Sequence, residues 1–154
     1  MIIPESYEQF PEGTYGYVYQ TIHIPSGKRY VGKKSLIYNQ KKKIGKREAA
    51  LWEGKGRQPV YKQVQKESDQ KTYYGSHQFI KEEIKNDNQA DFKRNILQLA
   101  YSKKELTYFE TKYQFLYQVL EKPDEFFNDN ILGKFYTKDF EVIEYEDPLE
   151  IKNC

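Results

Sequence analysis

Cysteine is almost absent from this chain: the only one is Cys154, the last of 154 residues. A lone thiol excludes a disulfide framework and a zinc site built from several thiolates, and it favours an intracellular protein. The segment Met1-Ile2-Ile3-Pro4-Glu5 has neither the basic nor the apolar part of a secretory leader. No apolar run approaches the roughly 20 residues of a membrane span. We therefore expect a cytoplasmic protein with no membrane partner.

Aliphatic side chains are also scarce, whereas aromatic residues make up 16% of the chain, with 15 tyrosines and 9 phenylalanines. The core must therefore contain many rings, and each buried phenol needs a partner for its hydroxyl group. A chain of 154 residues is long enough for one hydrophobic core but not for two. Residues 1–154 are accordingly predicted to form a single domain.

The formal net charge of +2 hides an uneven distribution of charge. Residues 33–71 carry twelve Lys and Arg against four acidic residues, a local charge of +8. Residues 121–154 carry ten acidic residues against four lysines, a local charge of −6. The basic segment predicts that one face of the molecule contacts a polyanion, and its candidate contacts are Lys34, Lys41, Lys42, Lys43 and Lys46. The competing interpretation is a solvated basic loop.

Two tyrosine-rich segments predict a β-hairpin near the N-terminus. Residues 15–24 alternate, with the tyrosines, Thr21 and His23 on one face and Val18, Ile22 and Ile24 on the other. Pro25-Ser26-Gly27 supplies a turn, and residues 28–33 predict the returning strand. The hairpin therefore has an aliphatic face for the core and a phenolic face that is left over.

The rest of the pattern predicts strands and helices around this hairpin. Residues 34–57 favour a loop or a short basic helix near 46–52, and residues 60–66, 92–100 and 134–145 favour strands. Ser76 is predicted to cap a helix that ends near residues 86–88, and Ser102 with Glu105 forms a capping box for a longer helix that runs to Pro123. The apolar stripe of that helix is Leu106, Phe109, Tyr113, Leu116, Tyr117 and Leu120. This order predicts an α+β fold with a small antiparallel three-stranded sheet flanked by helices.

Glu110 is the most informative single residue, because it lies at the edge of the apolar stripe of the long helix. A partly buried carboxylate costs several kcal/mol unless it is paired or bound to a metal ion. One interpretation is a salt bridge to a lysine of the sheet. The other is a ligand for Mg²⁺, which binds one or two carboxylates together with water and substrate phosphate.

Tyr19 and Tyr30 share one strand face of the predicted hairpin, and Lys33 and Lys34 follow directly. Cations near a phenol lower its pKa, which is the change that a phenolic general base needs. Ordinary core or surface aromatics are the alternative interpretation of both tyrosines. Further candidates, each with an ordinary structural alternative, are Arg47 or Arg57 for clamping a phosphate, His77 for assisting proton transfer, and Asn128, which otherwise is a turn residue.

Three blocks, in order, resemble the GIY-YIG endonuclease family. They are Tyr17-Val18-Tyr19 with Tyr30-Val31-Gly32, then Phe92-Lys93-Arg94-Asn95-Ile96-Leu97, and then the segment from Glu105 to Glu110 followed by Asn128. Tyr73-Tyr74-Gly75-Ser76 beside the basic insertion further resembles small phage-borne members. The resemblance implies a core of about residues 14–131, a basic insertion at 34–71 and an acidic C-terminal extension at 132–154. A phage-infected bacterium is then one expected setting.

By this resemblance, Tyr30 would act as general base on the attacking water, Tyr19 would orient the nucleophile or phosphate, and Lys33 would support the phenolate. Glu110 would hold one Mg²⁺ or Mn²⁺ ion, with no small-molecule cofactor. Asn128 would support the site from behind, and an arginine would neutralise the phosphate. The implied reaction is hydrolysis of a DNA phosphodiester bond.

Two departures from the family pattern leave the arginine open. The first triplet has Tyr17 and Val18 where the family has glycine and isoleucine, and Gln40 lies about where the family arginine is found. The competing functions are a non-catalytic nucleic-acid-binding module of the same fold, whose tyrosines stack on bases, and a structural or protein-interaction domain. We also expect modest sequence preference, because a hairpin with a lysine loop offers phosphate contacts. Homing, repair, restriction and genome degradation all fit these expectations.

Overall fold

The computed structural model describes residues 9–140. Their elements are, in chain order, β1 (Gly16–His23), β2 (Arg29–Ser35), β3 (Ile37–Lys43), α1 (Lys46–Ala50), β4 (Tyr61–Glu67), α2 (Gln78–Lys85), β5 (Phe92–Ala100), α3 (Lys103–Leu116), β6 (Asn130–Ile131) and β7 (Phe135–Tyr136). Short 3-10 helices lie at Gln89–Asp91 and Thr137–Asp139. The predicted α+β class is confirmed.

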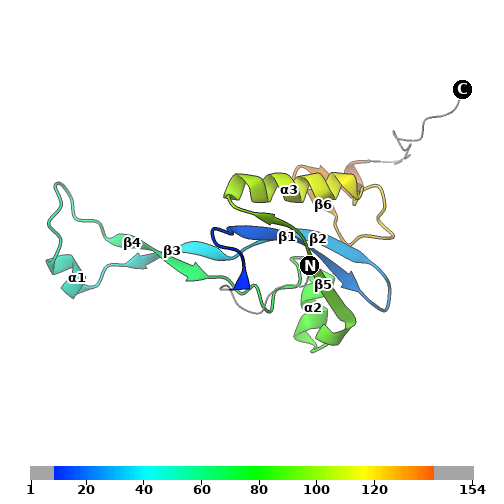
Figure 1. Cartoon of the computed structure of the whole chain (residues 1–154), viewed down its shortest axis with the longest axis horizontal. Coiled ribbons are helices and arrows are strands. Elements are labelled where there is room, and N and C mark those ends of the chain that lie inside the picture. The colour runs from blue at the N-terminus through cyan, green and yellow to red at the C-terminus, as the bar shows by residue number, and fades with distance from the viewer. Residues whose placement is uncertain (1–8, 141–154) are drawn as a thin grey trace, which may run out of the picture.

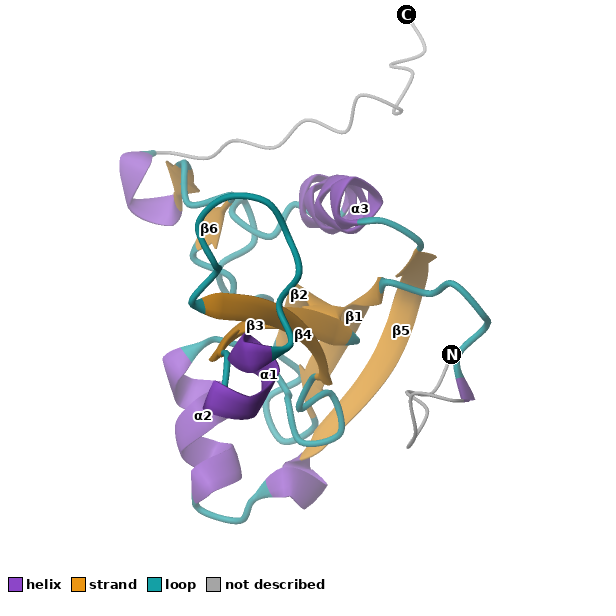
Figure 2. Ribbon diagram, turned by 90° about the vertical axis from the view of Figure 1, so that its left-hand side faces the viewer, coloured by secondary structure: helices purple, strands orange, loops and turns teal. Residues whose placement is uncertain are grey.

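A three-stranded antiparallel sheet in the order β2-β1-β5 forms the body of the molecule. The predicted hairpin is confirmed, with Tyr19 opposite Gly32 and Thr21 opposite Tyr30. The two tyrosines of interest therefore share one face, as expected. Helix α3 lies across one face of the sheet and α2 lies on the other side (Figures 1 and 2). Strand β2 is left at the edge.

Both faces of the sheet are buried, so the prediction of a free phenolic face is wrong. On the α3 side, Val18 and Val31 pack with Leu106 and Val119 in one core. On the opposite side, Tyr17 and Tyr19 are each only 1% exposed and pack in a second core with other apolar side chains, namely Phe10, Leu36 and Ile96. The scarcity of aliphatic residues is thus offset by rings, which fill the second layer.

Residues 37–67 form an arm that projects from the body, with the ribbon β3–β4 as its shaft and α1 near its tip (Figure 1). The strand expected at residues 60–66 and the short basic helix are confirmed, whereas β3 replaces part of the predicted loop. The root is fixed by Leu36, which is fully buried and whose backbone bonds to Tyr15 and Ser68. The basic insertion is therefore an ordered ribbon.

Two helix boundaries differ from the prediction. The cap of α2 is His77 and not Ser76, because the His77 ring accepts a hydrogen bond from the Phe79 amide. Ser102 caps α3 as expected, but the helix ends at Leu116, well before Pro123, because Gln118 adopts a left-handed φ of 56°. Leu116 is consequently 62% exposed and does not belong to the buried stripe.

The strand expected at residues 134–145 is reduced to the two residues of β7, followed by a 3-10 helix, and its part beyond residue 140 lies outside the described residues. Within residues 9–140, no helix is both long and apolar enough to cross a membrane.

Candidate active site

A cleft of about 620 Å³ runs along the edge strand β2, between α2, α3 and the segment that follows α3. Tyr30 lies on the face of the sheet that carries Tyr17 and Tyr19, whereas Glu110 comes from α3, which covers the other face. Both side chains reach the same cleft because no strand of the sheet lies beyond β2. The lining is mostly polar and consists of Tyr30, Lys33, Ser76, His77, Gln78, Glu110, Gln114, Asn128, Asp129, Asn130, Leu132 and Gly133.

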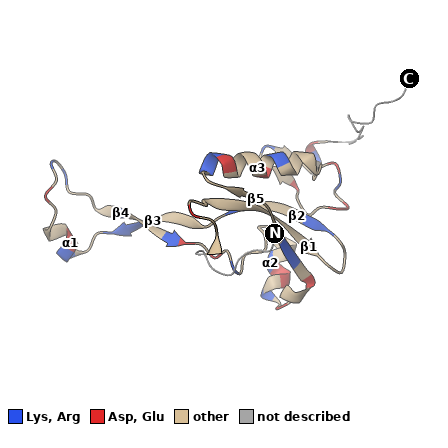
Figure 3. Ribbon diagram, viewed as in Figure 1, with Lys and Arg blue, Asp and Glu red and all other residues tan. Residues whose placement is uncertain are grey.

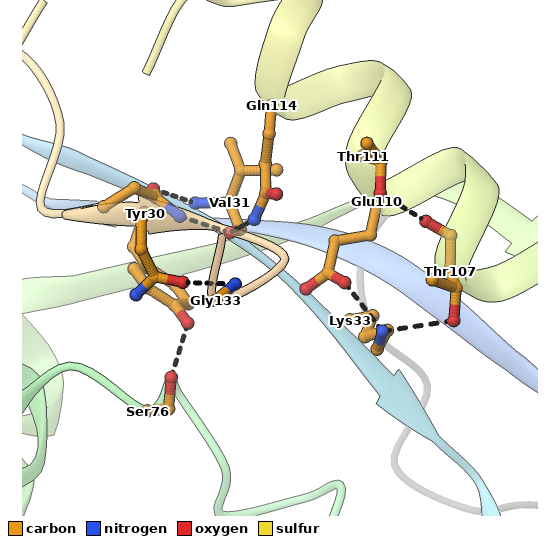
Figure 4. Close-up of polar contacts among 11 residues, drawn as sticks. Tyr30, Val31, Lys33, Ser76, Thr107, Glu110, Thr111, Gln114 and Gly133 are labelled. Carbon is orange, nitrogen blue, oxygen red and sulfur yellow. Dashed lines mark hydrogen bonds and ion pairs between the residues drawn. The ribbon is translucent and has the colours of Figure 1, made fainter. Parts of the chain in front are cut away.

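The Tyr30 phenol is held by Ser76, whose Oγ lies 2.6 Å from the phenolic oxygen (Figure 4). Burial raises the pKa of Tyr30 above its ordinary value, and the Ser76 hydrogen bond partly offsets this rise. The ring passes very close to Gly32, where an added Cβ would lie 2.7 Å from Tyr30 Cε1 and 2.7 Å from the Tyr19 hydroxyl. A glycine at position 32 therefore sets the position of both rings.

Tyr19 lies behind Tyr30 and is not among the residues that line the cleft. Its ring centroid is 6.2 Å from those of Tyr30 and Tyr73. Burial, reinforced by these neighbouring phenols, raises the pKa of Tyr19 well above its ordinary value. The expectation that nearby cations lower the pKa of the two tyrosines is therefore wrong for the protein alone, because desolvation outweighs the lysines.

Lys33 and Glu110 form an ion pair across the cleft, with Nζ 2.8 Å from Oε2 (Figure 4). Lys33 also donates to Thr107 Oγ1 at 3.2 Å, one turn earlier on α3. The Glu110 side chain is only 16% exposed, so its charge needs this partner. The salt bridge to a sheet lysine, the first of the two interpretations of Glu110, is thus present. Lys33 contacts the carboxylate and not the Tyr30 phenol.

Asn128 continues the edge of the sheet with its side chain. The chain after α3 runs beside β2, where Arg29 bonds through its backbone to Glu125 and Phe127. One residue after Phe127, the Asn128 side chain bonds to β2: Oδ1 accepts from the Val31 amide at 2.9 Å, and Nδ2 donates to the Val31 carbonyl at 2.8 Å. Asn128 is therefore a support for the strand that carries Tyr30 and Lys33, and not a simple turn residue.

His77 lines the cleft beside Ser76. Burial lowers the pKa of His77, which Asp129 opposes, so the neutral ring is favoured. Because Nδ1 accepts from the Phe79 amide, the neutral ring carries its proton on Nε2. In this tautomer His77 can donate a hydrogen bond to a ligand but cannot act as a base.

The candidate arginines do not join this group. Arg47 lies on α1 and Arg57 in the loop that follows, both exposed near the tip of the arm, and α1 lies far from α3 (Figure 1). No arginine of residues 9–140 lines the cleft, where Lys33 is the cation. Of the basic-segment lysines, Lys34 pairs with Asp69 at the root of the arm, while Lys41, Lys42, Lys43 and Lys46 are exposed along the arm.

The donors present suit a hard divalent cation bound by one carboxylate. Within residues 9–140 no group of three or more His, Cys, Asp or Glu side chains gathers. Glu110 is the part-buried carboxylate of the cleft, and Asp129 is an exposed one. A part-buried carboxylate in a polar cleft is the arrangement in which Mg²⁺ keeps water and substrate phosphate as its other ligands. Lys33 Nζ already contacts Glu110 Oε2, so a cation bound at this oxygen would compete with the ammonium group.

Several lining residues were not predicted as site residues. The sequence predicts Ser76 only as a helix cap, and Gln114 lies among the helical positions of α3 without any distinguishing spacing. Gln114 Nε2 donates to the Val31 carbonyl at 3.2 Å, so it shares the support role of Asn128. The signal available for Gln114 was a polar residue four positions after Glu110, on the same side of the helix.

An edge-strand cleft with a phenol, an ammonium group and a part-buried carboxylate can bind a phosphate and move a proton near it. The family model described as "Putative endonuclease segE, GIY-YIG domain" matches residues 3–131. No curated protein and no solved structure shows a significant match to the chain. The match to this family model covers both tyrosine triplets, the arm, α3 and Asn128. The chain therefore belongs to the GIY-YIG endonuclease family, whose members are nucleases that act on DNA.

Proposed function

We propose that the chain is a divalent-metal-dependent endonuclease that hydrolyses DNA phosphodiester bonds in the cleft beside β2. The observation that supports this function is the meeting of Tyr30, Lys33 and Glu110 in one polar cleft. In this proposal residues 1–154 form one catalytic domain, which carries the basic arm as a contact for DNA.

Tyr30 is proposed as the general base that takes a proton from the attacking water. Its phenolic oxygen lies in the cleft, and Ser76 holds it at 2.6 Å. A hydrogen bond that is donated to the phenolate lowers the pKa of the phenol, so Ser76 helps to form the reactive state. Tyr19 acts from behind the site, by fixing the position of the Tyr30 ring through their packing.

Glu110 is proposed to bind the metal ion, Mg²⁺ or Mn²⁺, which when bound stabilises negative charge on the phosphate and on the leaving oxygen. Lys33 is held at Glu110 in the free protein and is the cation available in the cleft to contact the phosphate. His77, with its proton on Nε2, is proposed to donate a hydrogen bond to a substrate oxygen. Asn128 and Gln114 keep β2 in place by binding Val31.

Nicking of supercoiled plasmid in Mg²⁺ or in EDTA tests this function. Tyr30→Phe removes the base, so we expect nicking to fall by about 100- to 10,000-fold while DNA binding is retained. Glu110→Gln is expected to abolish the dependence of the remaining rate on Mg²⁺. The matched controls are Tyr108→Phe, an exposed tyrosine outside the cleft, and Glu12→Gln, an exposed glutamate far along the chain. Both should leave nicking unchanged.

Three results would count against the proposal. Equal nicking in EDTA and Mg²⁺ would contradict the role of a metal ion at Glu110. Binding of duplex DNA with no nicking under any divalent cation would instead support the non-catalytic binding module. Retention of full activity in Tyr30→Phe would remove the proposed base, whatever the effect of Glu110→Gln.

A further inference from the structure

The β3–β4 ribbon has two faces of different composition. Its strands pair from Ile37 opposite Glu67 to Lys43 opposite Tyr61. Because side chains alternate along a strand, every second pair lies on the same face. One face carries the pair Ile37–Glu67 at the root of the arm and then the pairs Asn39–Gln65, Lys41–Gln63 and Lys43–Tyr61. We call the outer part of this face, beyond Ile37–Glu67, the amide face, and its six residues are Asn39, Lys41, Lys43, Tyr61, Gln63 and Gln65.

All six residues of the amide face are exposed. Within residues 9–140 none of their side chains makes a hydrogen bond or an ion pair with the protein. The opposite face differs, since Lys62 and Val64 are partly covered and Lys62 pairs with Glu48 of α1 at 2.5 Å. The amide face is therefore the free side of the two-stranded ribbon.

The chemistry of the amide face matches the edges of base pairs. Asn and Gln side chains present a donor beside an acceptor, which matches N6 and N7 of adenine, and Lys donates to O6 and N7 of guanine. The major groove of B-form DNA, about 12 Å wide, admits a two-stranded β-ribbon. Successive pairs on one face lie about 6.8 Å apart, against 3.4 Å for each base pair, so three pairs extend over about five base pairs.

We propose that the amide face reads base edges in the major groove of duplex DNA. Lys41 and Lys43 are the cations of this face itself, and Lys46 and Arg47 on α1 follow its outer end, where they add positive charge for the phosphates that border the groove. Lys and Arg residues recur along the arm (Figure 3). Duplex RNA does not offer the same site, because its A-form major groove is too deep and narrow for side chains. The inference rests on the proposed function for its choice of DNA. It replaces the expectation of modest sequence preference by readout over a short block.

The root of the arm connects the amide face to the strand that lines the cleft. Strand β2, which carries Tyr30 and Lys33, continues through the fully buried Leu36 directly into β3. On the returning side, Ser68 binds the backbone of Ser35 and Leu36. The ribbon is thus an extension of the strand that forms one wall of the cleft. The block that is read should therefore lie at a constant distance from the bond that is cut.

Selection from a library of random duplex DNA, in EDTA, tests the inference by binding alone. The full chain should enrich one contiguous block of about three to five base pairs. The triple variant Asn39→Ala, Gln63→Ala, Gln65→Ala removes three amides without changing the charge. Each lost amide contact should reduce discrimination at its base pair by about 5- to 150-fold, while affinity for bulk duplex changes less than about twofold.

Gln40→Ala is the matched control, because Gln40 is an equally exposed amide of the same ribbon on the opposite face. It should leave the enriched block intact. The single variants Asn39→Ala and Gln65→Ala should each weaken the preference at only some positions of the block. They keep the test informative if the triple variant unfolds.

The inference is overturned if the full chain enriches no block, if the triple variant retains the block, or if Gln40→Ala loses it to the same extent. Preferential enrichment of duplex RNA would overturn it as well. An enriched DNA block together with a failure to nick plasmid in Mg²⁺ would separate the two proposals. In that case the readout by the ribbon would stand and the nuclease activity would fall.

Discussion

Gly32 is the residue on which the positions of both site tyrosines depend. An added Cβ would lie 2.7 Å from the Tyr19 hydroxyl and 2.7 Å from Tyr30 Cε1, and both rings are packed in the second core. We therefore expect Gly32→Ala to lower the free energy of unfolding by about 1–3 kcal/mol, since an overpacked core must shift. Urea unfolding measures the change. Gly45→Ala is the control, because nothing lies within 4 Å of its Cβ position.

The Gly32 change should also reduce nicking, because it displaces the Tyr30 ring. A Gly32→Ala variant as stable as the parent chain, with the same nicking rate, would show that the close approach of the two rings does not constrain the site.

Ser76 gives a prediction on the pH dependence of cleavage. The hydrogen bond from Ser76 lowers the pKa of Tyr30, against the rise that burial causes. Ser76→Ala removes the lowering contribution, so the pKa of Tyr30 rises further and the reactive phenolate forms at higher pH. We expect the rising limb of the pH–rate profile to move to higher pH, with a lower rate at pH 8. A limb that stays in place would argue that Tyr30 is not the titrating base.

A serine outside the cleft provides the control for this profile. Ser26 lies in the hairpin turn and interacts with the His23 ring, 2.7 Å from Nδ1. Ser26→Ala should leave the pH–rate profile where it is.

The site residues that the sequence predicts best are those whose charge, when partly buried, requires a partner of opposite charge. Glu110 was identifiable because a carboxylate at the edge of an apolar stripe needs compensation, and Lys33 supplies it. The pKa of the tyrosines could not be predicted, because it depends on how deeply each ring is covered. That depth is set by the second core, which includes residues distant in sequence such as Leu36 and Ile96.

At the scale of elements, the segment after α3 completes the edge of the sheet. Val31 is fully buried, and its outward amide has Asn128 Oδ1 as its partner. Asn128→Ala leaves this amide unsatisfied, so we expect a loss of about 1–3 kcal/mol in the free energy of unfolding. Gln114→Ala should cost less, because Asn128 Nδ2 still donates to the same carbonyl. Urea unfolding of both variants gives the order, and equal costs would contradict this division of roles.

The boundaries of the elements show where local pattern is insufficient. Ser76 and His77 are both acceptable cap residues, and the choice of His77 follows from the bond between Ser76 and Tyr30, a contact across 46 positions. Strand β3 is rich in lysine and has no buried face, so its sequence favours a loop, whereas its stability comes from pairing with β4. The hairpin β1–β2 was predictable because its residues alternate with the period of a strand on both sides of a clear turn, although both faces of β1 are buried.

At the scale of the whole molecule, the body and the arm have different tasks. The body holds both cores and the cleft, whereas the strands of the arm pack chiefly on each other. Residues 38–66 carry nine Lys and Arg against two glutamates. Replacing the whole segment 38–66 by an Asn-Gly turn should therefore leave the thermal unfolding temperature of the body almost unchanged. The same deletion should weaken binding to DNA of any sequence.

Salt dependence separates this electrostatic role of the arm from the reading of bases. The slope of log Kobs against log salt changes by about 0.9 for each phosphate contact with B-form DNA. Each of Lys41, Lys42 and Lys43 that contacts a phosphate should make the slope shallower by about 0.9 when it is changed to Gln, so the triple change gives up to about 2.7. The control changes three exposed lysines of the body to Gln, namely Lys93, Lys103 and Lys104, and should change the slope less. Equal changes in slope would mean that the basic arm is a solvated segment and that DNA is bound by the body alone.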